Sequence, residues 1–152
     1  MKSRLLNETA GQRTFVIVLQ TGDETIACLK SFLAREQVGA AQMSAIGAFS
    51  EAELGYFDWQ KKEYLRNAFT EQLEVASLLG DVAVSAEQKP ALHIHVVLGR
   101  RDGTALAGHL LSARVRPTLE VILTEQPAHL QKIHDPESGL ALIAPEKTTG
   151  AG

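Results

Sequence analysis

The stretch that decides the fold is LHIHVVLGRRDGTALAGHLL, residues 92–111, which predicts two strands joined by a glycine-containing turn. It carries three of the five histidines in the chain. Successive side chains of a strand point to opposite faces, so His93 and His95 share a face. The residues that alternate with them, which we expect to point into the core, are Ile94, Val96 and Leu98.

The length of the turn determines whether the third histidine, His109, joins the other two. A two-residue loop, DG at 102–103, would turn His109 to the opposite face. A three-residue loop, RDG at 101–103, ends with glycine in the left-handed conformation that a type I turn followed by a G1 bulge requires. This second register places His109 opposite His95 and on its face, and it is the register that we expect.

Three imidazoles on one face of a sheet are costly to explain as packing, because each is polar and they repel one another when protonated. A metal ion resolves this conflict. Three neutral histidine nitrogens with one open position are typical of a catalytic zinc site. The pattern therefore predicts a site for a divalent metal, with zinc as the expected ion, formed by His93, His95 and His109.

The chain has 152 residues, which fits a single domain over residues 1–152. We expect a core at about 14–126 and a C-terminal extension over 127–152. The net charge is −3, and no run of five like charges occurs. This composition argues against a strong affinity for the nucleic-acid backbone, which needs a concentrated basic face.

A single cysteine, Cys28, excludes an intramolecular disulfide and suits a reducing cytoplasm. The first residues, MKSRLLNETAGQR, contain no apolar segment long enough for a signal peptide, and no segment reaches membrane-spanning length. We therefore expect a cytoplasmic protein with no membrane partner.

The remaining pattern predicts one main helix at about 23–37, with Asp23 as its N-cap. We expect Gly47 to mark a bulge or a close backbone approach. Another strand should begin at Pro117, and a helical turn should cover 127–133. The fold class is α+β, with a largely antiparallel sheet of about seven strands. The other expected strands cover 14–20, 40–48, 50–59, 64–69, 73–84 with an interruption at 80–81, and 139–144.

Two of these strands, at 14–20 and 117–126, are apolar almost throughout. One helix covers a sheet of this size incompletely. Another copy of the chain is the simplest cover for the remaining apolar surface, so the pattern predicts self-association.

Four landmarks occur in order: GAFSEAELGYFD at 47–58, LEVASLLGDVAV at 73–84, LHIHVVLGRRDG at 92–103 and AGHLLSARVRPTLEVIL at 107–123. Over about 15–126 the chain thereby resembles the plant and prokaryote conserved (PPC) domain family, as a prokaryotic single-domain member. The resemblance implies an α/β domain with a mainly antiparallel sheet, a homotrimer, and a metal site, for zinc, at His93, His95 and His109. Ala107 departs from the glycine common in the family.

The resemblance also implies an association with DNA, since the plant members are DNA-binding regulators that carry AT-hook segments. An AT-hook inserts arginines into the minor groove, and this chain has neither an AT-hook nor a basic arm. A trimeric, DNA-associated regulator is the first functional hypothesis. Its candidate nucleic-acid contacts are Arg100, Arg101, Arg114 and Arg116, although solvated turns and edge strands explain these arginines better.

The second hypothesis is a zinc-dependent enzyme that acts on a small molecule, because zinc lowers the pKa of a bound water to about 7. Glu120 and Glu74 are its candidate acid/base or supporting carboxylates. The third hypothesis is a purely structural metal, which usually has four protein ligands. His129 or His134 would then supply the fourth ligand, although both suit a surface position.

Overall fold

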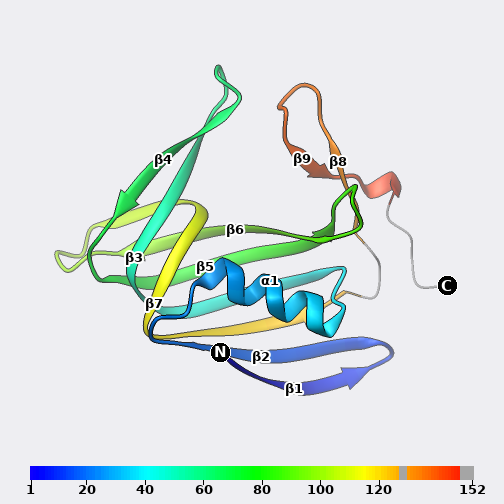
Figure 1. Cartoon of the computed structure of the whole chain (residues 1–152), viewed down its shortest axis with the longest axis horizontal. Coiled ribbons are helices and arrows are strands. Elements are labelled where there is room, and N and C mark those ends of the chain that lie inside the picture. The colour runs from blue at the N-terminus through cyan, green and yellow to red at the C-terminus, as the bar shows by residue number, and fades with distance from the viewer. Residues whose placement is uncertain (127–129, 148–152) are drawn as a thin grey trace.

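The protein, described by a computed structural model over residues 1–126 and 130–147, is built mainly of β-strands (Figure 1). One α-helix and one short 3₁₀ helix, Pro145–Lys147, accompany the strands in these ranges. The elements are β1 (Lys2–Thr9), β2 (Gln12–Gln20), α1 (Thr25–Glu36), β3 (Ala41–Asp58), β4 (Glu63–Phe69), β5 (Leu73–Val84), β6 (Pro90–Gly99), β7 (Ala105–Glu125), β8 (Lys132–His134) and β9 (Ala141–Ile143).

Seven strands form one sheet in the order β1-β2-β7-β6-β5-β3-β4, and every neighbouring pair in it is antiparallel. Strands β3 and β7 also pair with each other, so β3, β5, β6 and β7 form a closed ring of pairings. Strands β8 and β9 form a separate two-stranded hairpin. The predicted fold class, α+β with a largely antiparallel sheet of seven strands and one main helix, is confirmed.

Strands β3 and β7 are each longer than the sequence indicates, because each spans two segments that we expected to be separate. The register between them shifts at Gly47/Phe49 and again at Phe49/Glu51. Pro117 lies within β7 at this interruption, where its missing N–H costs no ladder bond. The backbone at Gly47 has a φ of 152°, and a Cβ there would lie 2.2 Å from the carbonyl oxygen of Thr118. The predicted close approach at Gly47 is confirmed.

Three local predictions are wrong. Strand β5 is continuous through residues 80–81, because it is paired on both sides, with β3 and β6. The N-cap of α1 is Glu24, whose carboxylate accepts the Ala27 N–H, whereas Asp23 accepts the Gln20 N–H and binds the amino group of Met1. Residues 132–133 belong to β8 instead of a helical turn, and 127–129 lie outside the described residues.

The core lies between α1 and the face of the sheet that it covers (Figure 1). The helix buries Leu29, Phe32 and Leu33 there.

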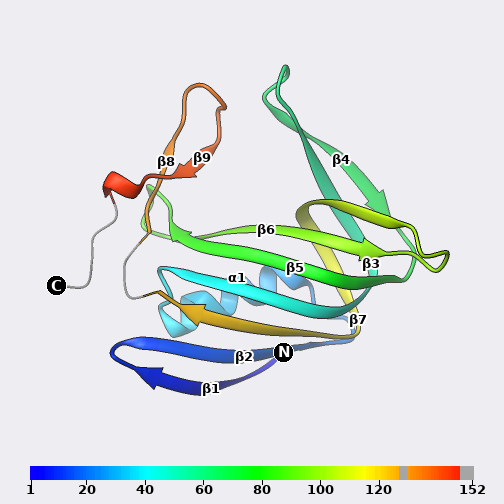
Figure 2. The ribbon, with the colours of Figure 1, turned by 180° about the vertical axis from the view of Figure 1, so that it is seen from behind.

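Figure 2 shows the opposite face of the sheet, on which no helix lies. No helix among the described residues is long and apolar enough to cross a membrane. The face of the sheet on which no helix lies is called the uncovered face below. The large apolar side chains exposed on it are Ile46, Leu79, Val97 and Ile122.

The close approach at Gly47 gives a test of the fold. We expect Gly47→Ala to lower the free energy of unfolding by about 3 kcal/mol, because the new Cβ overlaps β7 and the residue keeps an unfavourable φ. Gly11 is the matched control, since its φ is also positive, at 75°, but no atom lies within 4 Å of a Cβ built there. Gly11→Ala should cost only about 1 kcal/mol. Urea denaturation measures both, and equal losses would contradict the close packing at Gly47.

Candidate metal centre

The turn between β6 and β7 sets the register of the histidine hairpin. Gly103 adopts a left-handed φ of 83°, and its N–H donates to the carbonyl of Arg100 at 3.0 Å. The Arg100 N–H in turn donates to the carbonyl of Thr104 at 2.8 Å. This is the predicted three-residue loop, and His109 lies directly opposite His95. The prediction of one face for all three histidines is therefore confirmed.

The three imidazole rings form one compact cluster. One nitrogen of each ring lies within 4.8 Å of a nitrogen of the other two. The rings of His93 and His109 stack at 5.4 Å, and the ring of His95 stands edge-on to both. His95 is exposed, whereas His93 and His109 are half-buried. Three imidazole nitrogens at this spacing fit the ligand set of a divalent metal.

Burial and mutual repulsion favour the neutral form of two of these rings, His95 and His109. Burial, together with the nearby charges of His93, His95 and Lys132, lowers the pKa of His109 to about 4. Partial desolvation of the His95 ring and the nearby charge of His93 also lower the pKa of His95. The Nδ1 atom of His109 is buried without a hydrogen-bond partner. Metal binding requires neutral imidazoles, and an unpaired buried nitrogen is a further sign that a group outside the chain belongs here.

A carboxylate on the neighbouring strand orients His93. Asp81 of β5 is the direct cross-strand partner of His93, and its Oδ2 lies 3.1 Å from His93 Nδ1. An ionised carboxylate only accepts, so Nδ1 carries the proton and Nε2 is left for a metal. The other oxygen, Oδ1, lies 3.2 Å from the ammonium of Lys132, a side chain that is 7% exposed. Sequence reasoning missed both residues, although an aspartate inside the apolar run of β5 was a usable signal.

An aromatic ring closes the other side of the cluster. Tyr64 of β4 stacks on His109 with the ring centroids 4.9 Å apart. Gly55 of β3 pairs with His109, and a Cβ at Gly55 would lie 2.7 Å from the Tyr64 ring. Glycine at position 55 therefore makes room for the tyrosine beside the histidine.

Two hollows meet at the cluster, and His93 lines both. One, of about 420 Å³, opens on the uncovered face beside Leu79 and His95. The other, of about 440 Å³, lies between the histidines and the β8–β9 hairpin, and we call it the C-terminal pocket. Its lining residues are Tyr64, Ala91, Leu92, His93, His109, Lys132, Leu140, Ala141, Leu142 and Ile143.

The two glutamates that the sequence offered as acid/base partners lie elsewhere. Glu74 and Glu120 together line a hollow of about 550 Å³ beside Gly47 and Pro117. None of the three histidines lines that hollow. The carboxylate in contact with the cluster is instead that of Asp81.

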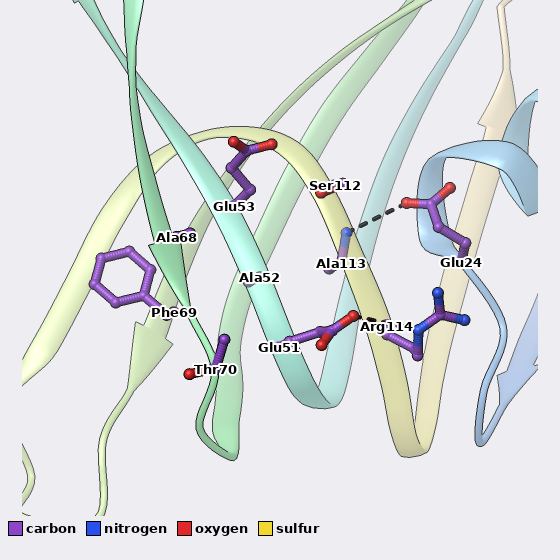
Figure 3. A pocket seen from close by; sticks show the side chains of 10 residues that line it. All are labelled: Glu24, Glu51, Ala52, Glu53, Ala68, Phe69, Thr70, Ser112, Ala113 and Arg114. Atoms are coloured by element: carbon purple, nitrogen blue, oxygen red, sulfur yellow. Dashed lines mark hydrogen bonds and ion pairs between the residues drawn. The ribbon is translucent and has the colours of Figure 1, made fainter.

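Two of the four candidate DNA-contacting arginines are engaged with glutamates. Arg114 pairs with Glu51 at 3.3 Å and donates to the carbonyl of Gly22, in the hollow drawn in Figure 3. Two further glutamates, Glu24 and Glu53, line this hollow, so its charge is unfavourable for a phosphate.

None of the other three arginines lines that hollow, although Arg100 lies over the ring of Phe69, which does. Arg100 pairs with Glu71 at 2.9 Å, next to the β6–β7 turn. Arg101, in the turn, and Arg116, in β7, are exposed. Arg100 and Arg114 therefore each pair with a glutamate, which offsets their positive charge.

The histidines considered as a fourth ligand do not join the cluster in the described part of the chain. His134 is exposed at the end of β8, and the cluster found within 1–126 and 130–147 has three members. His129 lies outside the described residues.

Comparison with solved structures shows extensive similarity. A metal-containing protein from Archaeoglobus fulgidus has 37% identity over 86% of this chain and 92% of its own, with a TM-score of 0.80. A protein from Bacteroides thetaiotaomicron, named a "putative dna binding protein", has 28% identity over 95% and 99%, with a TM-score of 0.84. A plant- and prokaryote-conserved (PPC) protein from Pyrococcus horikoshii has 28% identity over 94% of each chain, with a TM-score of 0.81. A comparison with curated proteins gave no match.

The family comparison agrees with the structural one. The profile of the Plants and Prokaryotes Conserved (PCC) domain matches residues 6–127. This range includes all three clustered histidines and the whole seven-stranded sheet except the first residues of β1. The chain belongs to the Plants and Prokaryotes Conserved domain family.

Proposed function

We propose that the protein binds one divalent metal ion, zinc, through His93, His95 and His109. The observation that carries this proposal is the convergence of three ring nitrogens within 4.8 Å. His93 would bind through Nε2, because Asp81 engages its Nδ1. The similarity to the metal-containing protein from Archaeoglobus fulgidus supports the same assignment.

We further propose that the metal serves ligand binding or catalysis and is not purely structural. A structural zinc usually has four protein ligands, and the cluster supplies three. Two hollows reach the histidines, so a ligand or water has access to a fourth position. At that position zinc would act as a Lewis acid. Asp81 and Lys132 would hold His93 in place, and Tyr64 would fix the ring plane of His109.

The first test is metal content. Untagged protein reconstituted with zinc and dialysed should contain about one zinc per chain by elemental analysis, and zinc should raise its melting temperature because only the folded site binds. His109→Ala should abolish both effects, since two imidazoles remain. His134→Ala, a histidine outside the cluster, is the control and should retain both. Equal zinc content in the two variants would refute the site.

A graded variant tests the role of Asp81. Asp81→Asn should weaken zinc binding about 10–100-fold, the usual cost of losing a carboxylate that orients a histidine ligand. Glu120→Gln makes the same chemical change at the carboxylate suggested by the sequence alone, and we expect no effect there. Competition with a chromogenic chelator measures both affinities.

We also propose that the chain assembles as a homotrimer through the uncovered face. Leu79, Ile46 and Ile122 are 63%, 63% and 43% exposed there. An apolar patch of this kind marks an interaction site more often than free surface. The number three comes from the resemblance to the PPC family. Because Leu79 pairs with His95, the metal site would lie at the rim of this interface.

Light scattering tests the assembly. Wild-type protein at micromolar concentration should give about three times the chain mass, and Leu79→Glu should give the monomer mass because a charge would be buried in the interface. Leu6→Glu introduces the same charge on the edge strand β1 and should leave the mass unchanged. A monomeric wild type would refute the trimer.

DNA binding is the second candidate function, favoured by the name of the Bacteroides thetaiotaomicron protein. The residues argue for a weak interaction. Affinity for duplex DNA comes largely from lysines and arginines that neutralise phosphates. The chain has 15 of these against 18 acids, and a trimer would carry three times its net charge of −3.

We therefore expect no binding of labelled duplex DNA at micromolar protein and physiological salt, as measured by fluorescence anisotropy. Submicromolar affinity with a steep salt dependence would contradict this. Loss of that affinity in Arg101→Ala or Arg116→Ala would then locate the contact at the exposed arginines.

A further inference from the structure

The C-terminal pocket combines an apolar wall with a polar floor. Six of its ten lining residues are aliphatic, and they come from the start of β6 and from the segment that forms the β8–β9 hairpin. The polar residues are Tyr64, His93, His109 and Lys132. A concave, mainly apolar hollow of several hundred Å³ with a few convergent polar groups is the usual form of a small-molecule site.

Specific contacts hold the hairpin beside the histidines. The N–H of Val84, at the end of β5, donates to the carbonyl of Leu130 at 2.7 Å, and Val84 forms a parallel bridge with Gln131. One residue further on, Lys132 is buried and reaches Asp81. The family match ends at residue 127, so the segment that walls the pocket lies outside the matched region.

The charges around the pocket are balanced before a metal binds. The carboxylate of Asp81 and the ammonium of Lys132 offset each other, and none of the ten described lining residues is an Asp or Glu. Three neutral histidines would leave the double positive charge of a bound zinc uncompensated. Beside a mainly apolar wall, which offers no compensating charge, such a charge attracts an anion. An ammonium also has three N–H donors, and the ion pair of Lys132 with Asp81 leaves donors for a further anion.

We infer that the C-terminal pocket binds a small carboxylate with an apolar body. Its carboxylate would occupy the open metal position next to Lys132, and its body would pack against Leu92, Leu140 and Leu142. This inference rests on the metal centre proposed above. It adds the class of ligand and assigns the β8–β9 hairpin a role in recognition.

Calorimetry on zinc-loaded, full-length protein tests the class of ligand. The probes are hexanoate, acetate and hexanamide. Hexanoate should bind at least about tenfold more tightly than acetate, because its additional methylenes are partly buried against the wall. Hexanamide, with the same body and no charge, should show no measurable binding. Equal affinities for hexanoate and acetate, or for hexanoate and hexanamide, would overturn the inference.

The double variant Leu142→Ala/Ile143→Ala tests the wall. Both side chains are partly exposed, at 45% and 38%, so their truncation should leave the fold intact. We expect the affinity for hexanoate to fall about tenfold while zinc content and acetate affinity stay unchanged. Leu6→Ala, on the distant strand β1, is the control. Unchanged hexanoate affinity in the double variant would refute the assigned wall, whereas failure to bind zinc at all would refute the metal centre instead.

Discussion

The site depends on a single residue of register in the hairpin between β6 and β7. Because side chains alternate along a strand, a shift by one residue would move His109 to the other face and separate it from His95. Gly103 prevents this shift by adopting the left-handed conformation that ends the three-residue loop. The alternating residues Ile94 and Val96, both buried, oppose the same shift through the core. Turn chemistry and hydrophobic burial thus specify one arrangement of the three imidazoles.

The two long strands extend this constraint to the rest of the sheet. Strand β7 carries His109 near one end and pairs with β2 near the other, while β3 pairs with both parts of β7. To pair along both parts of β7, β3 has to change its register with β7, and this change occurs around Gly47. Only glycine fits there, since a Cβ would overlap the backbone at Thr118. The position of the histidines beside β4 and Tyr64 therefore depends on packing at a distant bend.

The sequence predicted most of what alternation and turn chemistry determine locally. The strand and helix types, the three-residue loop and the buried face of β6 all follow from such patterns. The joining of segments into β3 and β7 could not be predicted, because bulges depend on the partner strand. Strand β1 was missed because all eight of its residues are exposed and carry no apolar alternation. Asp81 and Lys132 were missed because their meeting requires the pairing of β5 with β6 and the placement of the C-terminal hairpin.

The contact between Asp81 and Lys132 links the parts of the chain that surround the histidines. A lysine that is 7% exposed needs a partner, because burying an unpaired charge is costly. Asp81 supplies the partner with one oxygen and orients His93 with the other. The same carboxylate therefore anchors the β8–β9 hairpin and orients the ring of His93. Because these two roles share one side chain, the shape of the C-terminal pocket and the geometry of the histidine cluster are physically coupled.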